Sequence, residues 1–244
     1  MAKRTSVPAA SPLFAQIKAL IVERIRAGEW QAGNPLPSEH EFAEHYNVSQ
    51  GTVRKAIAEM AADNLVERYR GKGTFVASHT DEREHSRFFH FIGNDGVKQL
   101  PGSQSLSCQR AQATQDDQNL LGLSADKTVI VAERLRLIDG IPIILETITI
   151  SDDMFPGFRE AWNEEIPNEF YPLYETKYGI RVIGAKEQLS AVAAKDRVAK
   201  LLGVDPGAPL LQIDRIAYTF GEQPVERRVS QCNTAHHHYR RILS

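Results

Sequence analysis

Cysteine is scarce in this sequence, and long hydrophobic runs are absent from it. The two cysteines, Cys108 and Cys232, are too few for a disulfide scaffold and lack the spacing of metal ligands. No run of about 18 apolar residues could span a bilayer, and the N-terminus lacks the apolar segment of a signal peptide. We therefore expect a cytoplasmic protein with reduced thiols and no membrane partner.

A large net charge is also lacking, since the formal value at pH 7 is −2. That value argues weakly against a nucleic-acid partner until it is divided along the chain. Residues 1–78 carry ten Lys/Arg and eight Asp/Glu, or +2, whereas residues 79–244 carry nineteen and twenty-three, or −4. The N-terminal part is thus mildly basic, and the distribution of its charges on one face matters more than their sum.

A first helix is predicted after residues 1–11, a Ser-, Pro- and Ala-rich segment that we expect to be a flexible tail. Apolar side chains recur at helical spacing from Leu13 to Ile25, and Gly28 ends the run. This pattern indicates one amphipathic helix.

Two further helices are predicted close together. Ser38 stands three residues before Glu41, which forms a capping box and begins a helix that ends near His45. After a turn, Ser49 can cap a third helix, whose apolar stripe ends near residues 63–64. Such a unit, with short polar side chains at the start of its second helix, can place that helix in the major groove of DNA.

A hairpin is predicted next. The strand-like runs LVERY and TFVA flank Arg70–Gly73, where two glycines around a lysine suit a tight turn with a positive tip. Residues 78–86 are polar and lack periodicity, which fits a linker. We therefore expect a winged helix-turn-helix domain at residues 12–77 and a second domain at residues 87–244.

The second domain is predicted to be an antiparallel sheet with helices packed against it, which makes the whole chain an α+β protein. Turn signals at Asp139-Gly140 and at Gly221 favour hairpins over the regular strand–helix units of a parallel sheet. Strands are predicted near residues 87–92, 104–113, 127–138, 141–150, 181–192, 209–220 and 224–232, and helices near residues 116–121, 169–178 and 194–202.

Polar and basic side chains gather at the start of the third predicted helix and on the hairpin. Free backbone amides and the helix dipole favour phosphate at that helix end, and cations on the hairpin can lie along the adjacent groove or backbone. The alternative is a small helical bundle with a solvated face. The residues expected to contact DNA on this pattern are Ser49, Gln50, Gly51, Thr52, Arg54, Lys55, Arg68, Arg70 and Lys72.

Motifs across this region resemble the winged-helix domain of GntR-type bacterial transcription regulators. They are Gly28-Glu-Trp-x-x-Gly33, Leu36-Pro-Ser-Glu39, Val48-Ser-x-x-Thr-Val-Arg54 and Gly71-Lys-Gly-Thr-Phe-Val76. In the second half, Glu133–Glu146 and Gly221–Ser230 resemble the ligand-sensing UTRA domain of the HutC subfamily, an antiparallel sheet related to chorismate lyase. The resemblance implies an effector-responsive, sequence-specific transcription regulator.

The resemblance also implies which side chains contact operator DNA, and this sequence departs from the family at two of them. His40 stands where arginine is frequent, and Gln50 stands where arginine is usual. Glutamine pairs best with adenine and arginine with guanine, each good pair being worth roughly 1–3 kcal/mol of discrimination. We therefore expect DNA binding with a changed base preference. The other implied contacts are kept, at Ser38, Ser49, Thr52, Arg54 and Gly71.

Two arginines mark the second domain. Arg134 and Arg136 are two apart on one predicted strand, so both point to the same, largely apolar face. Two guanidinium forks there suit a carboxylate or a phosphate. The alternative is ion pairing with acids such as Glu146 or Glu187. The resemblance favours a pocket, because it implies that both arginines and Glu146 line the effector site.

The turn that follows these arginines determines where Glu146 lies. With a two-residue turn at residues 139–140, Arg134 would face Leu145, and Glu146 would point to the other side of the sheet. A three-residue loop with Gly140 in a bulge would place Glu146 beside the arginines. We expect the three-residue loop.

The effector is expected to be a small anion, with a carboxylate favoured over a sugar phosphate. Sugar-phosphate sensors of the family use small hydroxyl residues, whereas this chain has Phe88–Phe91 before the first sensing strand and Glu169 in place of a serine. A carboxylate at that place would repel a phosphate unless it turned away. Further pocket candidates are Phe89, His90, Tyr171 and Ser230. Tyr171, Ser230 and Phe89 could equally be core, and for Phe89 the core is favoured.

Other functions have less support. Neighbours among His236–His238 would point to opposite sides of an extended segment, and no acid or cysteine has suitable spacing, so we expect no metal and no cofactor. One recognition helix reads few bases, and this limit together with the family resemblance implies a homodimer on a palindromic operator. We expect this regulator to be a repressor. The rival interpretations are a chorismate-lyase-like enzyme, for which no nucleophile or cofactor motif is found, and a constitutive DNA-binder without a ligand.

Overall fold

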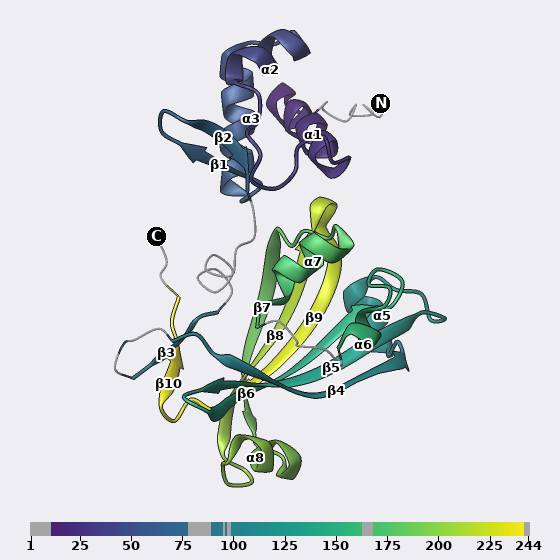
Figure 1. Cartoon of the computed structure of the whole chain (residues 1–244), viewed down its shortest axis with the longest axis vertical. Coiled ribbons are helices and arrows are strands. Elements are labelled where there is room, and N and C mark those ends of the chain that lie inside the picture. Colours follow the sequence, from purple (N-terminus) through teal and green to yellow (C-terminus); the bar gives the residue numbers. More distant parts are fainter. Residues whose placement is uncertain (1–10, 78–88, 95, 97–98, 163–167, 242–244) are drawn as a thin grey trace, which may run out of the picture. The chain divides into compact units, whose positions relative to one another are not determined.

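The computed structural model describes residues 11–77, 89–94, 96, 99–162 and 168–241. The chain divides into two units, residues 1–78 and residues 79–244 (Figure 1). The predicted linker at residues 78–86 and all but the last residue of the predicted tail lie outside the described residues.

The first unit combines helices with a hairpin. Ile17, Ile21 and Ile25 are buried along one side of the first helix, because residues four apart share a helix face. This helix packs against the third one. The elements are α1 (Leu13–Arg26), α2 (Glu39–Tyr46), α3 (Gln50–Ala62), β1 (Val66–Tyr69) and β2 (Gly73–Val76).

Local caps define the turn between α2 and α3. The Glu41 amide donates to the Ser38 hydroxyl at 3.2 Å, and the Ser38 amide donates to the Glu41 carboxylate at 2.7 Å, which confirms the predicted capping box. Asn47 ends α2 in the left-handed region at φ 52°. Ser49 then caps α3, because its hydroxyl accepts from the Thr52 amide at 3.1 Å.

The hairpin has the predicted tight tip. β1 and β2 pair antiparallel from Val66↔Val76 to Tyr69↔Gly73, which leaves residues 70–72 as the loop. Gly71 lies at φ 75°, a conformation that side-chain-bearing residues rarely adopt, so the tight loop favours glycine there.

The second unit is built on a six-stranded sheet in the order β4-β5-β6-β9-β8-β7 (Figure 1). Every neighbouring pair is antiparallel, which confirms the predicted α+β class. The strands are β4 (Gly102–Gln112), β5 (Thr128–Ile138), β6 (Ile141–Ser151), β7 (Gly184–Ala193), β8 (Pro209–Thr219) and β9 (Gln223–Cys232), and the helices are α5 (Gln115–Leu121), α6 (Phe158–Ala161), α7 (Phe170–Tyr178) and α8 (Asp196–Leu202).

Three short elements have no counterpart among the predicted ones. They are α6, a 3-10 turn at Phe220–Glu222 that joins β8 to β9, and β10 (His237–Tyr239). β10 pairs with β3 (Phe91–Gly93), which is the described part of the first predicted strand. Two of the three adjacent histidines therefore belong to a two-stranded ribbon.

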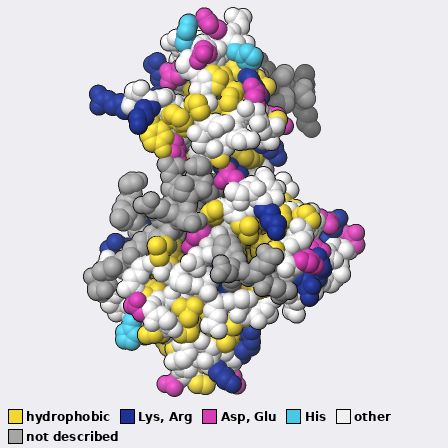
Figure 2. Space-filling model, viewed as in Figure 1, with side chains coloured by type: hydrophobic (Ala, Val, Ile, Leu, Met, Phe, Trp, Pro, Cys, Tyr) yellow, Lys and Arg dark blue, Asp and Glu magenta, His cyan; other side chains and the backbone are white. Residues whose placement is uncertain are grey.

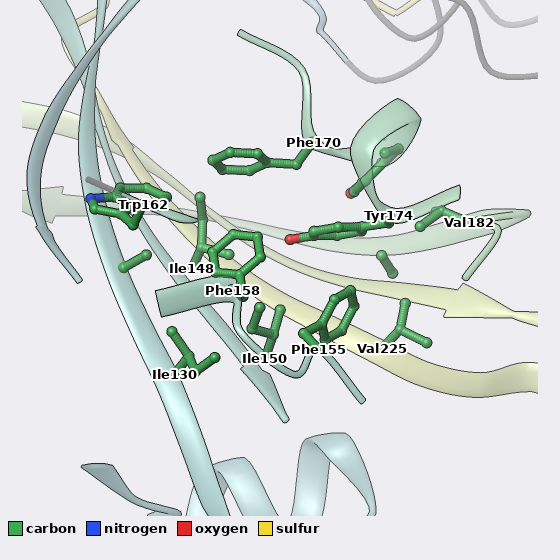
Figure 3. Close-up of a cluster of buried hydrophobic side chains, with 13 residues drawn as sticks. Ile130, Ile148, Ile150, Phe155, Phe158, Trp162, Phe170, Tyr174, Val182 and Val225 are labelled. Atoms are coloured by element: carbon green, nitrogen blue, oxygen red, sulfur yellow. The ribbon is translucent and has the colours of Figure 1, made fainter. Parts of the chain in front are cut away.

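Aromatic side chains form the core on one face of the sheet (Figure 3). Ile130 and Ile150 lie on the strands, and Phe158, Phe170 and Tyr174 of α6 and α7 pack over them. Phe170 and Tyr174 are one helical turn apart and stack with their ring centroids 6.1 Å apart. This core fixes α7 against the sheet.

The opposite face is covered by α8. Leu135 and Leu145 point to this side because successive side chains of a strand alternate between faces. They pack with Val198 and Leu202 of α8 in a second apolar cluster. The arginines at positions 134 and 136 therefore point to the α7 side.

The turn between β5 and β6 differs from the prediction. Ile138 pairs with Ile141, so Asp139-Gly140 is a two-residue turn, and the expected three-residue loop is wrong. Both turn residues have positive φ, 50° and 78°, as a type I′ turn requires. The two-residue turn is favoured over the three-residue loop because its twist matches that of the flanking strands.

A bulge lies within β6 instead of at the turn. Leu137 pairs with Pro142 and Arg136 pairs with Ile144, which leaves Ile143 as the extra residue. The extra residue shifts the register by one. Glu146 consequently lies on the side of the arginines, although the turn has two residues.

Candidate functional site

The start of α3 presents an exposed polar surface. Ser49, Gln50, Gly51 and Arg54 are exposed, and the Ser49 and Thr52 hydroxyls lie 2.9 Å apart. The apolar side chains of α3 point the other way, into the first unit's core. This helix end can therefore offer hydroxyls, an amide and a cation to a ligand without uncovering the core.

Gln50 and His40, the two departures from the family pattern, contact each other. The Gln50 side-chain amide lies 3.2 Å from His40 Nδ1, and His40 Nε2 lies 3.4 Å from the Glu44 carboxylate. The imidazole thus stands between an amide on α3 and an acid one turn further along α2. Such a contact can orient the Gln50 amide before DNA binds.

Glu39 holds two cations of this surface. Its carboxylate accepts from Arg54 Nε at 2.8 Å and from Arg68 Nη2 at 3.0 Å. Both arginine side chains are about half exposed, 61% and 49%, so phosphate can compete with Glu39 for them. The pairing brings α2, α3 and β1 together at one polar site.

The hairpin tip extends the basic character. Arg70, Gly71 and Lys72 are exposed, and Figure 2 shows cations projecting where Figure 1 places the loop between β1 and β2. Flexible cations on a narrow hairpin suit contacts to the DNA backbone.

Two other predicted DNA contacts have structural partners of their own. Lys55 Nζ lies 3.9 Å from the centroid of the Phe14 ring on α1, a cation–π contact that uses the charge inside the unit. The Ser38 hydroxyl is engaged in the capping box. The DNA contact of Ser38 stays a prediction, whereas a DNA contact of Lys55 would require this side chain to leave the Phe14 ring.

A pocket in the second unit gathers most of the predicted effector residues. It encloses about 470 Å³ of empty space, part of it open to solvent. Polar side chains come from β5, β6, β8, β9 and the residue before α7, and aromatic ones come from the β3–β10 ribbon and the two residues before β3. The predicted residues that line it are Phe89, His90, Arg134, Arg136, Glu146, Glu169 and Ser230.

Arg134 is fully buried and faces Glu146 across β5 and β6. Its Nε donates to the Glu146 carboxylate at 2.6 Å, and its Nη1 donates to the Asn168 carbonyl at 2.9 Å. The guanidinium also lies 4.2 Å from the centroid of the Phe170 ring. Both alternatives raised by the sequence are therefore present, since Arg134 forms an ion pair and lines the pocket.

Arg136 reaches the start of α7. Its Nη2 donates to Glu169 at 2.9 Å, and its Nη1 donates to the Ser103 hydroxyl at 3.1 Å and to the Asn168 carbonyl. Arg136 Nε is buried and has no hydrogen-bond partner among the described residues. Glu187, the other acid considered for these arginines, pairs instead with Arg215.

Sequence reasoning missed Arg215 and Arg228, which also line the pocket. They lie opposite each other on β8 and β9, so their side chains share a face. Arg228 binds both oxygens of Glu226, at 3.0 and 2.9 Å. Their signal in the sequence was an arginine amid strand-forming residues, which alternation alone does not assign to a buried face.

The charges of the pocket stabilise one another. Burial lowers the pKa of Arg134 to about 10, although the Glu146 carboxylate opposes the shift. Burial would raise the pKa of Glu146, but the guanidiniums of Arg134, Arg228 and Arg136 hold it well below its usual range. Both groups are therefore charged at neutral pH.

Tyr171 belongs to the core rather than to the pocket wall. It is fully buried in the aromatic cluster, and its hydroxyl donates to Glu226 at 3.1 Å. Of the two roles that the sequence left open for Tyr171, the structure favours the core one, because the ring packs in the aromatic cluster and its hydroxyl is bonded to Glu226. Tyr239 lines the pocket instead, and its hydroxyl donates to Glu187 at 2.6 Å.

Phe89 takes both roles that the sequence allowed. It lines the pocket, and it also packs against the apolar cluster that contains Phe91 and Ile144. The His90 ring lies edge-on to Tyr239, with centroids 5.2 Å apart. The β3–β10 ribbon and the two residues before it thus supply an aromatic wall beside the arginines.

The described residues include both thiols and side chains of the types that bind metals. No group of three or more His, Cys, Asp or Glu side chains there is arranged to hold a metal ion. Burial raises the pKa of the Cys108 thiol to about 11 and that of Cys232 well above its usual value, which opposes thiolate formation. Within the same residues, none of the helices is long and apolar enough to cross a membrane.

Sequence comparisons agree with this two-unit organisation. Residues 13–76 match the family described as bacterial regulatory proteins of the gntR family, and residues 98–238 match the UTRA domain. The HTH-type transcriptional repressor NagR of Bacillus subtilis (strain 168) is 30% identical over 208 residues, 85% of this chain and 84% of the relative. A probable fructoselysine utilization operon repressor of Escherichia coli (strain K12) is 30% identical over 215 residues, 87% of each chain.

Solved structures are similar as well. The ligand-binding domain of a GntR-family transcriptional regulator from Bordetella bronchiseptica is 34% identical, with a TM-score of 0.60, and the match covers 65% of this chain and 98% of that one. PhnF from Mycobacterium smegmatis, at 24% identity and a TM-score of 0.56, matches over 93% of this chain and 99% of its own. The second similarity supports the fold alone.

Proposed function

Because this chain belongs to the GntR family of bacterial regulatory proteins and carries a UTRA domain, we propose that it is an effector-responsive repressor. A homodimer would hold a palindromic operator and release it when a small carboxylate binds the second unit. The relatives named above are transcriptional repressors, which supports the coarser part of this proposal.

The pocket is the observation that carries the proposal. Four buried arginines converge on one hollow in a chain whose other unit has an exposed polar helix start and a basic hairpin. Buried guanidiniums are costly unless they have acidic partners, so a site rich in them suits the recognition of an anion. A structural ion-pair network alone would not require a hollow.

Switching would need only a modest coupling energy. If the effector favours a dimer arrangement that no longer matches the half-site spacing, about 1–3 kcal/mol of coupling is enough. Two recognition helices related by a two-fold axis would read the two halves of the operator.

Two experiments test this proposal, one on DNA binding and one on ligand binding. Full-length protein is first used to select sites from random DNA, and we expect a palindromic consensus. A thermal-shift panel then tests anionic metabolites that the products of neighbouring genes are expected to handle. Metabolites that stabilise the protein are tested for release of the selected DNA site. Arg134→Ala should lose the shift, and Arg134→Lys, which keeps the charge but not the fork, serves where the alanine variant does not fold.

Two rivals give different outcomes. A chorismate-lyase-like enzyme would turn over a chorismate-like ligand, which thermal shift followed by product analysis detects. A constitutive DNA-binder would show no metabolite effect on operator binding. Metabolites that stabilise wild type and the Arg134 variants equally would contradict the arginine pocket.

A further inference from the structure

We propose that a monocarboxylate effector binds the Arg136 guanidinium in place of Glu169, which acts as an internal substitute for the ligand. This inference rests on the proposed function, because it takes the pocket to be the effector site.

The pocket arginines differ in how fully they use their donors. Nε and Nη2 lie on one edge of a guanidinium, the edge that holds a carboxylate through two parallel hydrogen bonds. Arg228 uses both donors on Glu226, at 3.0 and 2.9 Å. Arg215 directs both toward one oxygen of Glu187, at 2.7 and 2.5 Å. For these two arginines the edge is fully occupied.

The same edge of Arg136 is half used. Nη2 donates to one Glu169 oxygen at 2.9 Å, whereas the buried Nε has no hydrogen-bond partner in the described part of the chain. A buried donor without a partner carries a desolvation penalty. A ligand carboxylate that spanned Nε and Nη2 would remove this penalty, which the single contact of Glu169 does not.

Glu169 is also the least firmly held of the pocket acids. It occupies the N-cap position of α7 but makes no capping hydrogen bond, and Arg136 is its one polar side-chain partner among the described residues. Glu146, by contrast, projects from the middle of β6 between Arg134 and Arg228. An acid at a helix end can turn away more easily than one within a sheet.

Charge balance selects the ligand class. Arg134, Arg136, Arg215 and Arg228 are matched by the carboxylates of Glu146, Glu169, Glu187 and Glu226. An added anion would leave an excess buried negative charge, which is unfavourable. Exchange of Glu169 for a ligand carboxylate preserves the balance, whereas a phosphate dianion would not.

The exchange also has a structural consequence at α7. The Asn168 carbonyl accepts from both Arg134 and Arg136, and Phe170 lies against the Arg134 guanidinium. When Glu169 leaves Arg136, the first turn of α7 loses one of its contacts with the sheet. Effector binding would thereby reach an element outside the pocket wall.

The experiment measures acetate binding to the full-length protein by calorimetry and thermal shift, against chloride at equal ionic strength. Glu169→Gln keeps the shape of the side chain and an acceptor for Arg136 but removes the competing charge. We expect this variant to bind acetate roughly tenfold or more tightly than wild type, since a charged hydrogen bond no longer has to be broken. Inorganic phosphate should stabilise wild type no more than chloride does.

Two controls separate exchange from a general charge effect. Glu133→Gln removes a carboxylate that pairs with Arg197 on the opposite face of β5, and it should leave acetate affinity unchanged. Adding Arg136→Lys to Glu169→Gln removes the fork and should abolish the gain. An equal gain in Glu133→Gln, a gain that survives Arg136→Lys, or acetate that stabilises neither protein beyond chloride each overturns the proposal.

DNA binding is measured separately so that the two proposals fail in different ways. Arg136-dependent acetate binding with no effect on operator retention would contradict the proposed function and leave the exchange standing. Operator release by a metabolite whose affinity is the same in wild type and Glu169→Gln would contradict the exchange at Arg136 and leave the proposed function standing.

Discussion

Glu146 lies directly opposite Arg134 on the neighbouring strand, and its carboxylate accepts a 2.6 Å hydrogen bond from Arg134 Nε. The pairing depends on the bulge at Ile143, because without the extra residue Arg134 would face Leu145. One residue in β6 therefore decides whether the pocket contains a buried ion pair or a buried arginine facing a leucine.

Removing this carboxylate should destabilise the second unit. In Glu146→Gln the buried guanidinium of Arg134 loses its counter-charge, and we expect a loss of about 3–5 kcal/mol in the free energy of unfolding. Urea denaturation at neutral pH measures it. Glu133→Gln breaks an exposed ion pair on the same sheet, with Arg197 58% exposed, and should cost less than about 1 kcal/mol. Equal losses in the free energy of unfolding of the two variants would show that burial of the ion pair does not increase its contribution to stability.

Stability should also fall in acid because of Glu146. Its folded-state pKa is depressed by the neighbouring guanidiniums, so its contribution is present above the unfolded-state pKa of about 4.3 and is lost as the pH drops toward the folded-state value. Denaturation midpoints measured from pH 6 downward should decline in wild type below about pH 4.3 and decline less steeply in Glu146→Gln. Parallel declines would assign the acid sensitivity to other carboxylates.

Gln50 should determine one position of the operator. Glutamine suits adenine and arginine suits guanine, so Gln50→Arg should move the preference at that base from adenine to guanine by roughly 1–3 kcal/mol. Selection from random DNA by both proteins measures the change. His40→Ala, which frees the Gln50 amide, should broaden the preference at the same position without moving it. Identical consensus sites for wild type and Gln50→Arg would falsify this assignment.

Cations of the first unit should differ in their salt dependence. If Lys72 contacts a phosphate, Lys72→Ala should lower the slope of log K against log salt by about 0.9. Lys55 rests on the Phe14 ring, so Lys55→Ala should leave that slope unchanged. Operator affinity measured across a salt series gives both slopes, and a reversed order would mean that Lys55 leaves Phe14 to reach DNA.

The α2 capping box should contribute to the stability of the first unit. Ser38→Ala removes the acceptor of the Glu41 amide and should cost about 1 kcal/mol. Denaturation followed by the fluorescence of Trp30, which packs against Phe42, reports on this unit when Trp162 is replaced by Phe. Thr114→Ala removes the equivalent cap of α5 and should leave the Trp30 transition unchanged.

The helices of the first unit were predictable because their signals are local. The Ser38 and Ser49 caps, the spacing of Ile17 and Ile25, and the glycine at the hairpin tip each act within a few residues. The same holds for the strands of the second unit, whose turns are marked in the sequence.

Partnerships across the fold were not predictable in the same way. The choice of Glu187 for Arg215 and the approach of Glu169 to Arg136 join residues about 30 positions apart in the chain. The alignment of Arg215 with Arg228 depends on the register of β8 against β9. The contact of Lys55 with α1 was unpredictable for a similar reason, because helical periodicity does not show which neighbouring element an exposed cation will contact.

The sequence by itself determined the longer helices and strands, the α+β class and most residues of both sites, because capping, periodicity and turn chemistry are short-range effects. Tertiary structure decided the placement of Glu146 through a bulge three residues beyond the turn, and it assigned each buried arginine its acid. Strand register and ion-pair partners depend on which segments pack together, and that choice minimises buried unpaired charge over the whole unit rather than within any one stretch of chain.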